Sequence, residues 1–211
     1  MYFRILHDET GGELTYLLAD MDAREAVLID PRACDLALLQ ALLAERDLRL
    51  RWILRTHQHD NLNQQEPIHL ARLSAPLIQG TVAHGAQVGT DGQILPFGDE
   101  LVRILATPGH TAGCLSFAWR DRLFCGGLLA VDGCPDQATP SDPEALWDSV
   151  VQRIFTLADE TLLFSGHERC SRAVSTVLEQ RRSNPFFAGR TRDEFLARAS
   201  AIATPSTSLR N

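Results

Sequence analysis

The stretch that decides the fold is Thr56-His57-Gln58-His59-Asp60-Asn61-Leu62, which follows an expected strand at residues 51–55 with Trp52, Ile53 and Leu54 at its centre. Two histidines at positions i and i+2 on a loop that leaves a strand can point at one centre. A second expected strand, at residues 101–106, leads into Thr107-Pro108-Gly109-His110 and supplies a third imidazole. Three neutral imidazoles with open positions suit one divalent metal, zinc or iron. The sequence therefore predicts metal ligands at His57, His59 and His110.

The end of the same loop lacks the groups that a second metal would need. Asn61 and Leu62 stand where a carboxylate and a fourth imidazole would complete a two-metal centre. Leucine cannot coordinate, and a neutral amide is a poor substitute for a carboxylate. The loop therefore predicts at most one metal. A metal-free protein that keeps the site only as inherited scaffold is the alternative.

The length of 211 residues fits one large domain, which we expect at residues 1–200, followed by a loose C-terminal tail at residues 201–211. The formal net charge of −7 disfavours nucleic acid as a partner. All 20 basic residues are arginine, so Schiff-base chemistry and a lysine general base are excluded.

The five cysteines are an odd number at scattered spacings, and they form neither a zinc-ribbon pattern nor a disulfide framework. A reducing compartment is therefore expected. The first residues turn polar too soon for a secretory signal, and no apolar run approaches membrane-spanning length. We expect a cytoplasmic protein without a membrane partner, for which a homodimer is one possible assembly.

Short apolar runs and helical periodicity predict a mixed fold. The first strands, at residues 2–6, 14–19 and 26–29, are expected to form an antiparallel meander. Further strands are expected at residues 51–55, 76–79, 101–106, 114–119, 123–125 and 161–164. Helices are expected at residues 35–46, 66–73, 143–155, 172–181 and 192–199, with a loop at residues 131–143. Strands in two groups, each with helices, predict two packed sheets covered by helices on both outer sides.

Four motifs in order give the chain a resemblance to the metallo-β-lactamase superfamily, and within it to the glyoxalase II and persulfide dioxygenase branch. The family patterns T-H-x-H-x-D-H, T-P-G-H-T, F-x-G-D and G-H correspond to residues 56–62, 107–111, 124–127 and 166–167. Each motif is weak alone, but four in order at family-like spacing form a strong signal. The resemblance implies an α/β (α+β) fold, an αββα sandwich of the metallo-β-lactamase type, with its metals at one edge between the sheets.

The resemblance also implies roles for single residues. His57, His59 and His110 fall on the first metal site of the hydrolase members, and His167 falls on a ligand of the second site. Gly127 replaces the aspartate that bridges two metals in the hydrolases or binds a single iron in the persulfide dioxygenases. With the second site lost, we expect His167 to support a ligand or to transfer a proton.

The missing carboxylate at Gly127 leaves several possibilities open. The resemblance to the persulfide dioxygenases implies iron ligands at His57, at His110 and at the aspartate that is absent here. His59 could supply the third ligand instead. The position without a side chain could also admit an anion or a substrate thiolate. Asp60, inside the histidine loop, is a candidate base, with a solvated carboxylate as the alternative.

Cys125 lies two residues before Gly127 on an expected strand, so both would face the same way. It could approach the metal as a thiolate or act as a redox thiol. A buried structural cysteine is the commoner role for such a residue.

The resemblance implies a small thiol-derived substrate, either a glutathione-type thioester for a hydrolase or a persulfide for a sulfur dioxygenase. After Cys134 the chain continues with Pro135-Asp136-Gln137-Ala138, where the persulfide dioxygenases have a G-R-T-D-F segment. This difference affects both the persulfide chemistry and the glutathione subsite. A metal-free pseudoenzyme, serving as a binding or regulatory module, is the alternative function.

Overall fold

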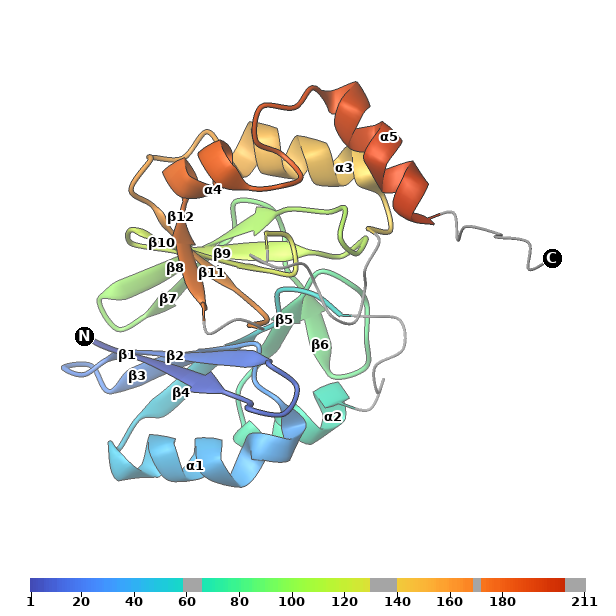
Figure 1. The fold of residues 1–211 in the computed structure, drawn as a ribbon. Coiled ribbons are helices and arrows are strands. Elements are labelled where there is room, and N and C mark those ends of the chain that lie inside the picture. Colours follow the sequence, from blue (N-terminus) through green and yellow to red (C-terminus); the bar gives the residue numbers. More distant parts are fainter. Residues whose placement is uncertain (59–65, 130–139, 169–171, 204–211) are drawn as a thin grey trace.

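Two six-stranded sheets lie face to face, with helices on both outer surfaces (Figure 1). The computed structural model describes residues 1–58, 66–129, 140–168 and 172–203. The first sheet has the order β1-β2-β3-β4-β5-β6, and the second has the order β12-β11-β10-β9-β8-β7. This arrangement confirms the predicted αββα sandwich.

Each sheet takes its strands from one half of the chain. The first contains β1 (Tyr2–His7), β2 (Leu14–Asp20), β3 (Glu25–Ile29), β4 (Arg49–Leu54), β5 (Leu77–Gln79) and β6 (Ala86–Val88). The second contains β7 (Ile94–Phe97), β8 (Glu100–Ala106), β9 (Leu115–Trp119), β10 (Arg122–Gly126), β11 (Leu162–Ser165) and β12 (Val174–Thr176). Strands β1, β2 and β3 pair antiparallel, as predicted.

The helices divide between the two outer surfaces in the same way (Figure 1). The first sheet is covered by α1 (Leu36–Glu45) and α2 (Glu66–Leu70), with the 3-10 turns η1 (Ala33–Asp35) and η2 (Ala71–Leu73) beside them. The second sheet is covered by α3 (Pro143–Asp148), the π-helical segment η3 (Ser149–Ile154), α4 (Val177–Ser183) and α5 (Arg192–Ala203). Within the described part of the chain, none of these helices combines the length and hydropathy needed to cross a membrane.

Strand β2 shows why the sequence forms a covered sheet. All its residues are buried, because alternate side chains of a strand enter different layers. Tyr16 and Leu18 face the core between the sheets, whereas Leu17 and Ala19 face the layer beneath α1. A strand that is apolar on both faces therefore lies inside the sandwich rather than at its surface.

Aromatic rings join the two sheets across the central core. Phe3 and Tyr16 come from the first sheet, and Phe124 and Phe164 come from the second. The ring centroids of Tyr16 and Phe124 lie 4.9 Å apart, and those of Phe124 and Phe164 lie 5.1 Å apart. Ring pairs at this spacing add to the free energy gained from burial alone. Phe124 contacts Phe3 and Tyr16 of the first sheet and Phe164 of its own sheet, and its side chain is fully buried.

The predicted helix at residues 172–181 is wrong in its first part. Val174–Thr176 forms strand β12, antiparallel to β11, and helix α4 begins at Val177. Thr176 ends the strand and caps the helix, since its Oγ1 accepts a hydrogen bond from the Glu179 backbone N at 3.1 Å. A strand of three residues is too short to show an alternating pattern, so helical periodicity extended across it.

Besides β12, two further edge strands have no counterpart in the prediction. Strand β6 ends the first sheet and β7 ends the second. Strand β7 contains Pro96, which is compatible with an edge because proline cannot donate to a second neighbour. Of the predicted tail at residues 201–211, the first three residues belong to helix α5, and residues 204–211 lie outside the described residues, as does most of the predicted loop at residues 131–143.

Strand β10 ends in an irregularity that changes the expected direction of Cys125. Its pairing with β11 shifts register between Phe124 and Gly126, and Gly126 has a φ of 56°. Gly127 lies beyond the strand, so strand alternation does not relate its direction to that of Cys125. Cys125 is 2% exposed and packs in the apolar cluster between the second sheet and its helices. This environment is that of a structural cysteine.

Replacing Phe124 with alanine should lower the free energy of unfolding by about 3–5 kcal/mol, because a fully buried ring is removed from the contact between the sheets. Urea denaturation followed by tryptophan fluorescence measures this loss. Leu101→Ala, at a side chain that is 51% exposed, is the control and should change stability by less than about 0.5 kcal/mol. Equal losses in the two variants would contradict the central role of Phe124.

The Cys125 thiol should be unreactive in the folded protein. Burial raises its pKa to about 12, so the thiolate, which is the nucleophilic form, is scarce at about pH 8. Iodoacetamide at that pH should alkylate the exposed Cys34 and leave Cys125 unmodified until the chain unfolds. Peptide mass spectrometry locates the adducts. Alkylation of Cys125 in native protein at the rate of Cys34 would mean that the thiol is accessible.

Candidate functional site

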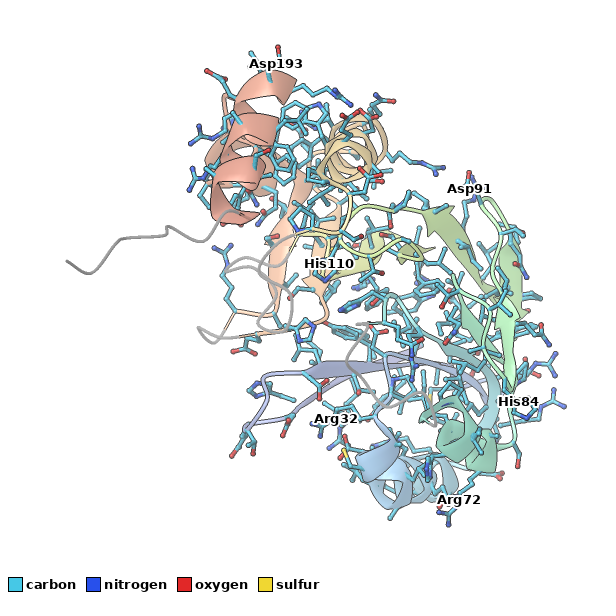
Figure 2. All side chains as sticks on the ribbon, turned by 90° about the vertical axis from the view of Figure 1, so that its right-hand side faces the viewer. Arg32, Arg72, His84, Asp91, His110 and Asp193 are labelled. Atoms are coloured by element: carbon cyan, nitrogen blue, oxygen red, sulfur yellow. The ribbon has the colours of Figure 1, made fainter. Side chains whose placement is uncertain are left out.

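Three of the histidines singled out in the sequence come together where the two sheets meet. His57 follows strand β4 of the first sheet, whereas His110 follows β8 and His167 follows β11 of the second. The ring centroid of His57 lies 5.3 Å from that of His110 and 5.4 Å from that of His167. Figure 2 shows His110 between the first sheet and the layer that contains α3 and α5. We call these three residues the histidine cluster, of which His57 is the middle ring.

Two rings of the histidine cluster face each other through their Nε2 atoms. These atoms of His57 and His167 are 3.2 Å apart. A nitrogen pair at this distance can share one hydrogen or face a common cation. Two imidazole nitrogens on one tetrahedral zinc, each at about 2.0–2.1 Å, lie roughly 3.3 Å from each other. The pair therefore has the donor type and the spacing of two ligands of a single metal.

A hydrogen-bond relay runs from Asp30 through Thr56 to His57. Thr56 Oγ1 donates to Asp30 Oδ2 at 2.7 Å and lies 2.8 Å from His57 Nδ1. Because a hydroxyl has one hydrogen and the ionised carboxylate can only accept, Thr56 Oγ1 must accept from the Nδ1–H of His57. The Nε2 atom of His57 then carries a lone pair in the neutral ring. This tautomer presents a metal-binding nitrogen to the histidine cluster.

Gly126 allows the second sheet to approach this relay. A Cβ added at Gly126 would collide with Thr56 Oγ1 and would lie 2.9 Å from His57 Nδ1. The φ of 56° at Gly126 is also a conformation that favours glycine. Glycine is therefore required here for both space and backbone geometry.

The His110 ring occupies the space beside Gly127 where a side chain would begin. A Cβ built at Gly127 would lie 2.5 Å from both Nε2 and Cδ2 of the His110 ring. His110 is 4% exposed, so its ring is enclosed on its other sides as well. The sequence suggested an open position for an anion or a thiolate beside Gly127. Instead, the imidazole occupies the space that the first atom of any side chain at residue 127 would need.

The loop that carries His110 is held by the helical layer. Ser149 Oγ donates to the Pro108 carbonyl oxygen at 2.7 Å, and the Asp142 backbone N donates to the Gly109 carbonyl oxygen at 3.0 Å. Gly109 has a φ of 133°, which favours glycine. These contacts come from the start of α3 and from η3, so the placement of His110 depends on a segment more than thirty residues away in the sequence.

The segment that carries His167 is bound to the first sheet. The Leu14 backbone N donates to the Gly166 carbonyl oxygen at 2.9 Å, and the Tyr16 hydroxyl donates to the Ser165 carbonyl oxygen. Burial raises the pKa of Tyr16 well above its usual value, so the hydroxyl stays protonated and remains a donor. Ser165 Oγ in turn donates to the His167 carbonyl oxygen at 2.7 Å. His167 is therefore held by both sheets, although it follows a strand of the second.

Several predicted site residues lie outside the described residues. They are His59, Asp60, Asn61 and Leu62 of the histidine loop and Pro135-Asp136-Gln137-Ala138. Among the residues that the structure does describe, no group of three or more histidine, cysteine, aspartate or glutamate side chains is arranged to hold a metal ion. The predicted ligand set of His57, His59 and His110 therefore stays a prediction.

Sequence reasoning assigned no role in the site to Asp30 or Thr56. Both were visible as parts of motifs, since Asp30 ends the third strand and Thr56 precedes the first histidine. Strands β3 and β4 pair in parallel, with Ile29 opposite Leu54. A prediction of this pairing from the sequence would have placed Asp30 and Thr56 side by side. Strands paired in this register bring the residues at their carboxyl ends to the same edge of the sheet.

Comparison with known proteins identifies relatives that share most of the chain, although no family model matches it. Human mitochondrial persulfide dioxygenase ETHE1 is 36% identical over 191 residues, which cover 86% of this chain and 74% of the human protein. The crystal structure of ETHE1 from Myxococcus xanthus matches with a TM-score of 0.86 and 34% identity, covering 98% of this chain and 93% of that one.

A more distant relative belongs to the hydrolase side of the same group. Hydroxyacylglutathione hydrolase from Vibrio cholerae is 28% identical over 171 residues, which cover 77% of this chain and 64% of the hydrolase. Together with the αββα architecture and the clustered histidines, these similarities identify the family. The chain belongs to the metallo-β-lactamase superfamily, in the branch that holds the persulfide dioxygenases and the hydroxyacylglutathione hydrolases.

Proposed function

We propose that this protein is an enzyme that holds one divalent metal and acts on a glutathione-type persulfide when the metal is iron or on a glutathione-type thioester when it is zinc. The observation that supports the proposal is the histidine cluster, whose His57 and His167 Nε2 atoms lie 3.2 Å apart in a chain 36% identical to a persulfide dioxygenase. Neutral imidazoles suit both iron and zinc. Bound iron would supply the oxygen chemistry of a sulfur dioxygenase, and bound zinc would supply the Lewis acidity of a thioester hydrolase.

The charge of the site favours an anionic sulfur ligand. Asn61 and Gly127 stand where relatives carry carboxylates, so these positions bring no negative charge to a bound cation. A divalent cation on neutral imidazoles keeps its full charge, and a persulfide or thiolate anion would compensate it. Soft sulfur ligands also bind iron and zinc well.

The residues around the site hold the imidazole rings of His57 and His110 in position before a metal binds. The Asp30–Thr56 relay orients His57 and keeps the hydrogen on its Nδ1 atom. The hydrogen bonds to Pro108 and Gly109 hold the loop that leads to His110, and burial keeps water away from most of its ring. Side chains held in this way lose little conformational entropy on binding, which raises affinity and precision.

A metal-free binding or regulatory module is the second candidate function. The observation in its favour is the His110 ring that fills the space beside Gly127. Where catalysis is no longer selected, we expect a site to lose its carboxylates and neighbouring side chains to fill the space. The two candidates differ in whether the purified protein contains metal.

Metal content and substrate turnover test the proposal. Untagged protein, purified anaerobically without chelators, should contain close to one iron or zinc per chain by elemental mass spectrometry. The iron form should consume oxygen with glutathione persulfide, whereas the zinc form should hydrolyse a hydroxyacylglutathione thioester. Metal content near zero that stays there after reconstitution would support the metal-free module. Full metal occupancy without either activity would contradict the substrate assignment alone.

Thr56→Val should weaken metal binding because it breaks the relay to His57 with little change in shape. Loss of a hydrogen-bond partner behind a metal ligand costs roughly 10–100-fold in affinity, and we expect a loss in that range from competition with a coloured chelator. Thr90→Val, at an exposed threonine, is the matched control and should bind metal as the wild type does. Unchanged affinity in Thr56→Val would contradict the role of the relay.

A further inference from the structure

We infer that the region where α4 leads into α5 is a docking surface for an acidic segment of a partner protein. Three exposed arginines form it, Arg182, Arg190 and Arg198, and we call them the arginine surface. They belong to the helical layer outside the second sheet (Figure 1). The inference requires no metal at the histidine cluster, so it does not depend on the proposed function.

The first argument is the distribution of charge along the chain. Residues 1–168 contain 12 arginines and 24 aspartates and glutamates, whereas residues 172–203 contain six arginines and three aspartates and glutamates. The last two helices therefore form a basic layer on a protein whose formal net charge is −7. A charge asymmetry of this kind indicates an interaction with an anionic partner.

The second argument is that no carboxylate of the described residues neutralises the arginine surface. Two other arginines of the same layer, Arg181 and Arg192, form ion pairs with carboxylates. The three arginines of the surface form no such pair within the part of the chain that the structure describes. Glu194, an acidic neighbour of Arg190, accepts instead from the backbone N and Oγ1 of Thr191. The surface thus keeps positive charges that a carboxylate from outside the chain can pair with.

The third argument is that Arg190 and Arg198 are held side by side. Arg190 Nε and an end nitrogen of Arg198 both donate to the Pro185 carbonyl oxygen, each at 3.3 Å. The Arg198 guanidinium also lies 5.0 Å from the centroid of the Phe186 ring, a contact that orients its plane. Each guanidinium commits one of its three nitrogens to Pro185. The remaining N–H groups can donate to carboxylates, for which the planar fork of arginine is well suited.

The fourth argument is the rigidity of the turn beneath these two side chains. Asn184 is buried, and its Nδ2 donates to Gln180 Oε1 at 2.7 Å while its Oδ1 accepts from the Phe186 backbone N at 2.9 Å. The stacked rings of Phe187 and Phe195, with centroids 4.9 Å apart, attach the turn to α5. A surface held in this way loses little conformational entropy when a partner binds.

The exposure of the arginine surface favours a protein segment over a small anion. An isolated ion pair in water contributes little to affinity, so one small anion on exposed arginines gains little. Several carboxylates on one partner segment can contact the three arginines together, and linked contacts reinforce one another. Nucleic acid carries a denser negative charge and is repelled more strongly by the excess of carboxylates in residues 1–168.

Binding of a fluorescein-labelled, glutamate-rich peptide to the full-length chain tests the inference, with fluorescence anisotropy at low salt as the readout. The wild-type chain should bind the peptide, and added salt should weaken binding because exposed charges are screened. Combining Arg190→Glu with Arg198→Glu should lower the affinity about tenfold or more, since each change removes an attraction and adds a repulsion.

Arg4→Glu combined with Arg103→Glu is the matched control, because both arginines are exposed, lie outside the helical layer and undergo the same change of charge. Its affinity should stay within about threefold of the wild type. Circular dichroism establishes that each variant is folded, and Arg190→Gln with Arg198→Gln replaces the charge reversal should the latter not fold.

Three results would overturn the inference. They are a wild-type chain that does not bind the peptide, equal losses in the two combined variants, and tighter binding of duplex DNA or anionic lipid vesicles than of the peptide. Metal content, measured on the same preparations, should be equal in the wild type and all variants. Failure of the docking surface is therefore distinguishable from failure of the proposed function.

Discussion

The carboxylate of Asp30 makes the pair of hydrogen bonds on which the site depends. It accepts from both the backbone N and the Oγ1 of Thr56, each at 2.7 Å, and so ties the carboxyl ends of β3 and β4 together where His57 begins. Asp30 has a φ of 50°, a conformation that costs on the order of 1 kcal/mol for a residue with a side chain. The two charge-assisted bonds offset this strain. Gly126 then packs against the same threonine from the opposite sheet, so both halves of the sandwich determine where the His57 ring lies.

The glycine at residue 127 changes the site in shape as well as in charge. The family pattern F-x-G-D has an aspartate where this chain has Gly127, and a glycine brings neither a side-chain ligand nor a negative charge. The buried His110 ring lies against Gly127, so close that a Cβ at residue 127 would collide with it. The glycine therefore lets an imidazole from another loop pack against the main chain.

Membership of a family and the chemistry of a site are separate conclusions for this chain. The sandwich, the motif order and the identity of 34–36% to persulfide dioxygenases establish the family. The chain departs from the motifs of the family at Asn61, Leu62 and Gly127. A fold hosts many activities, and function depends on the groups at the site. The architecture therefore identifies the family, and the chemistry has to be argued from the side chains at the site.

The sequence by itself determined the layers of the fold and the residues to examine. Strand β2 and helix α1 follow from local patterns of apolar and polar residues. The motifs likewise singled out His57, His110 and His167. The tertiary structure alone decided the strand at Val174–Thr176, the outward direction of Cys125, the relay from Asp30 and the meeting of His57 with His167. Periodicity reports which faces of a segment are buried, which is a local property. The rotation of a side chain and the approach of two rings depend instead on neighbours that the fold brings from distant parts of the chain, such as the 110 positions that separate His57 from His167.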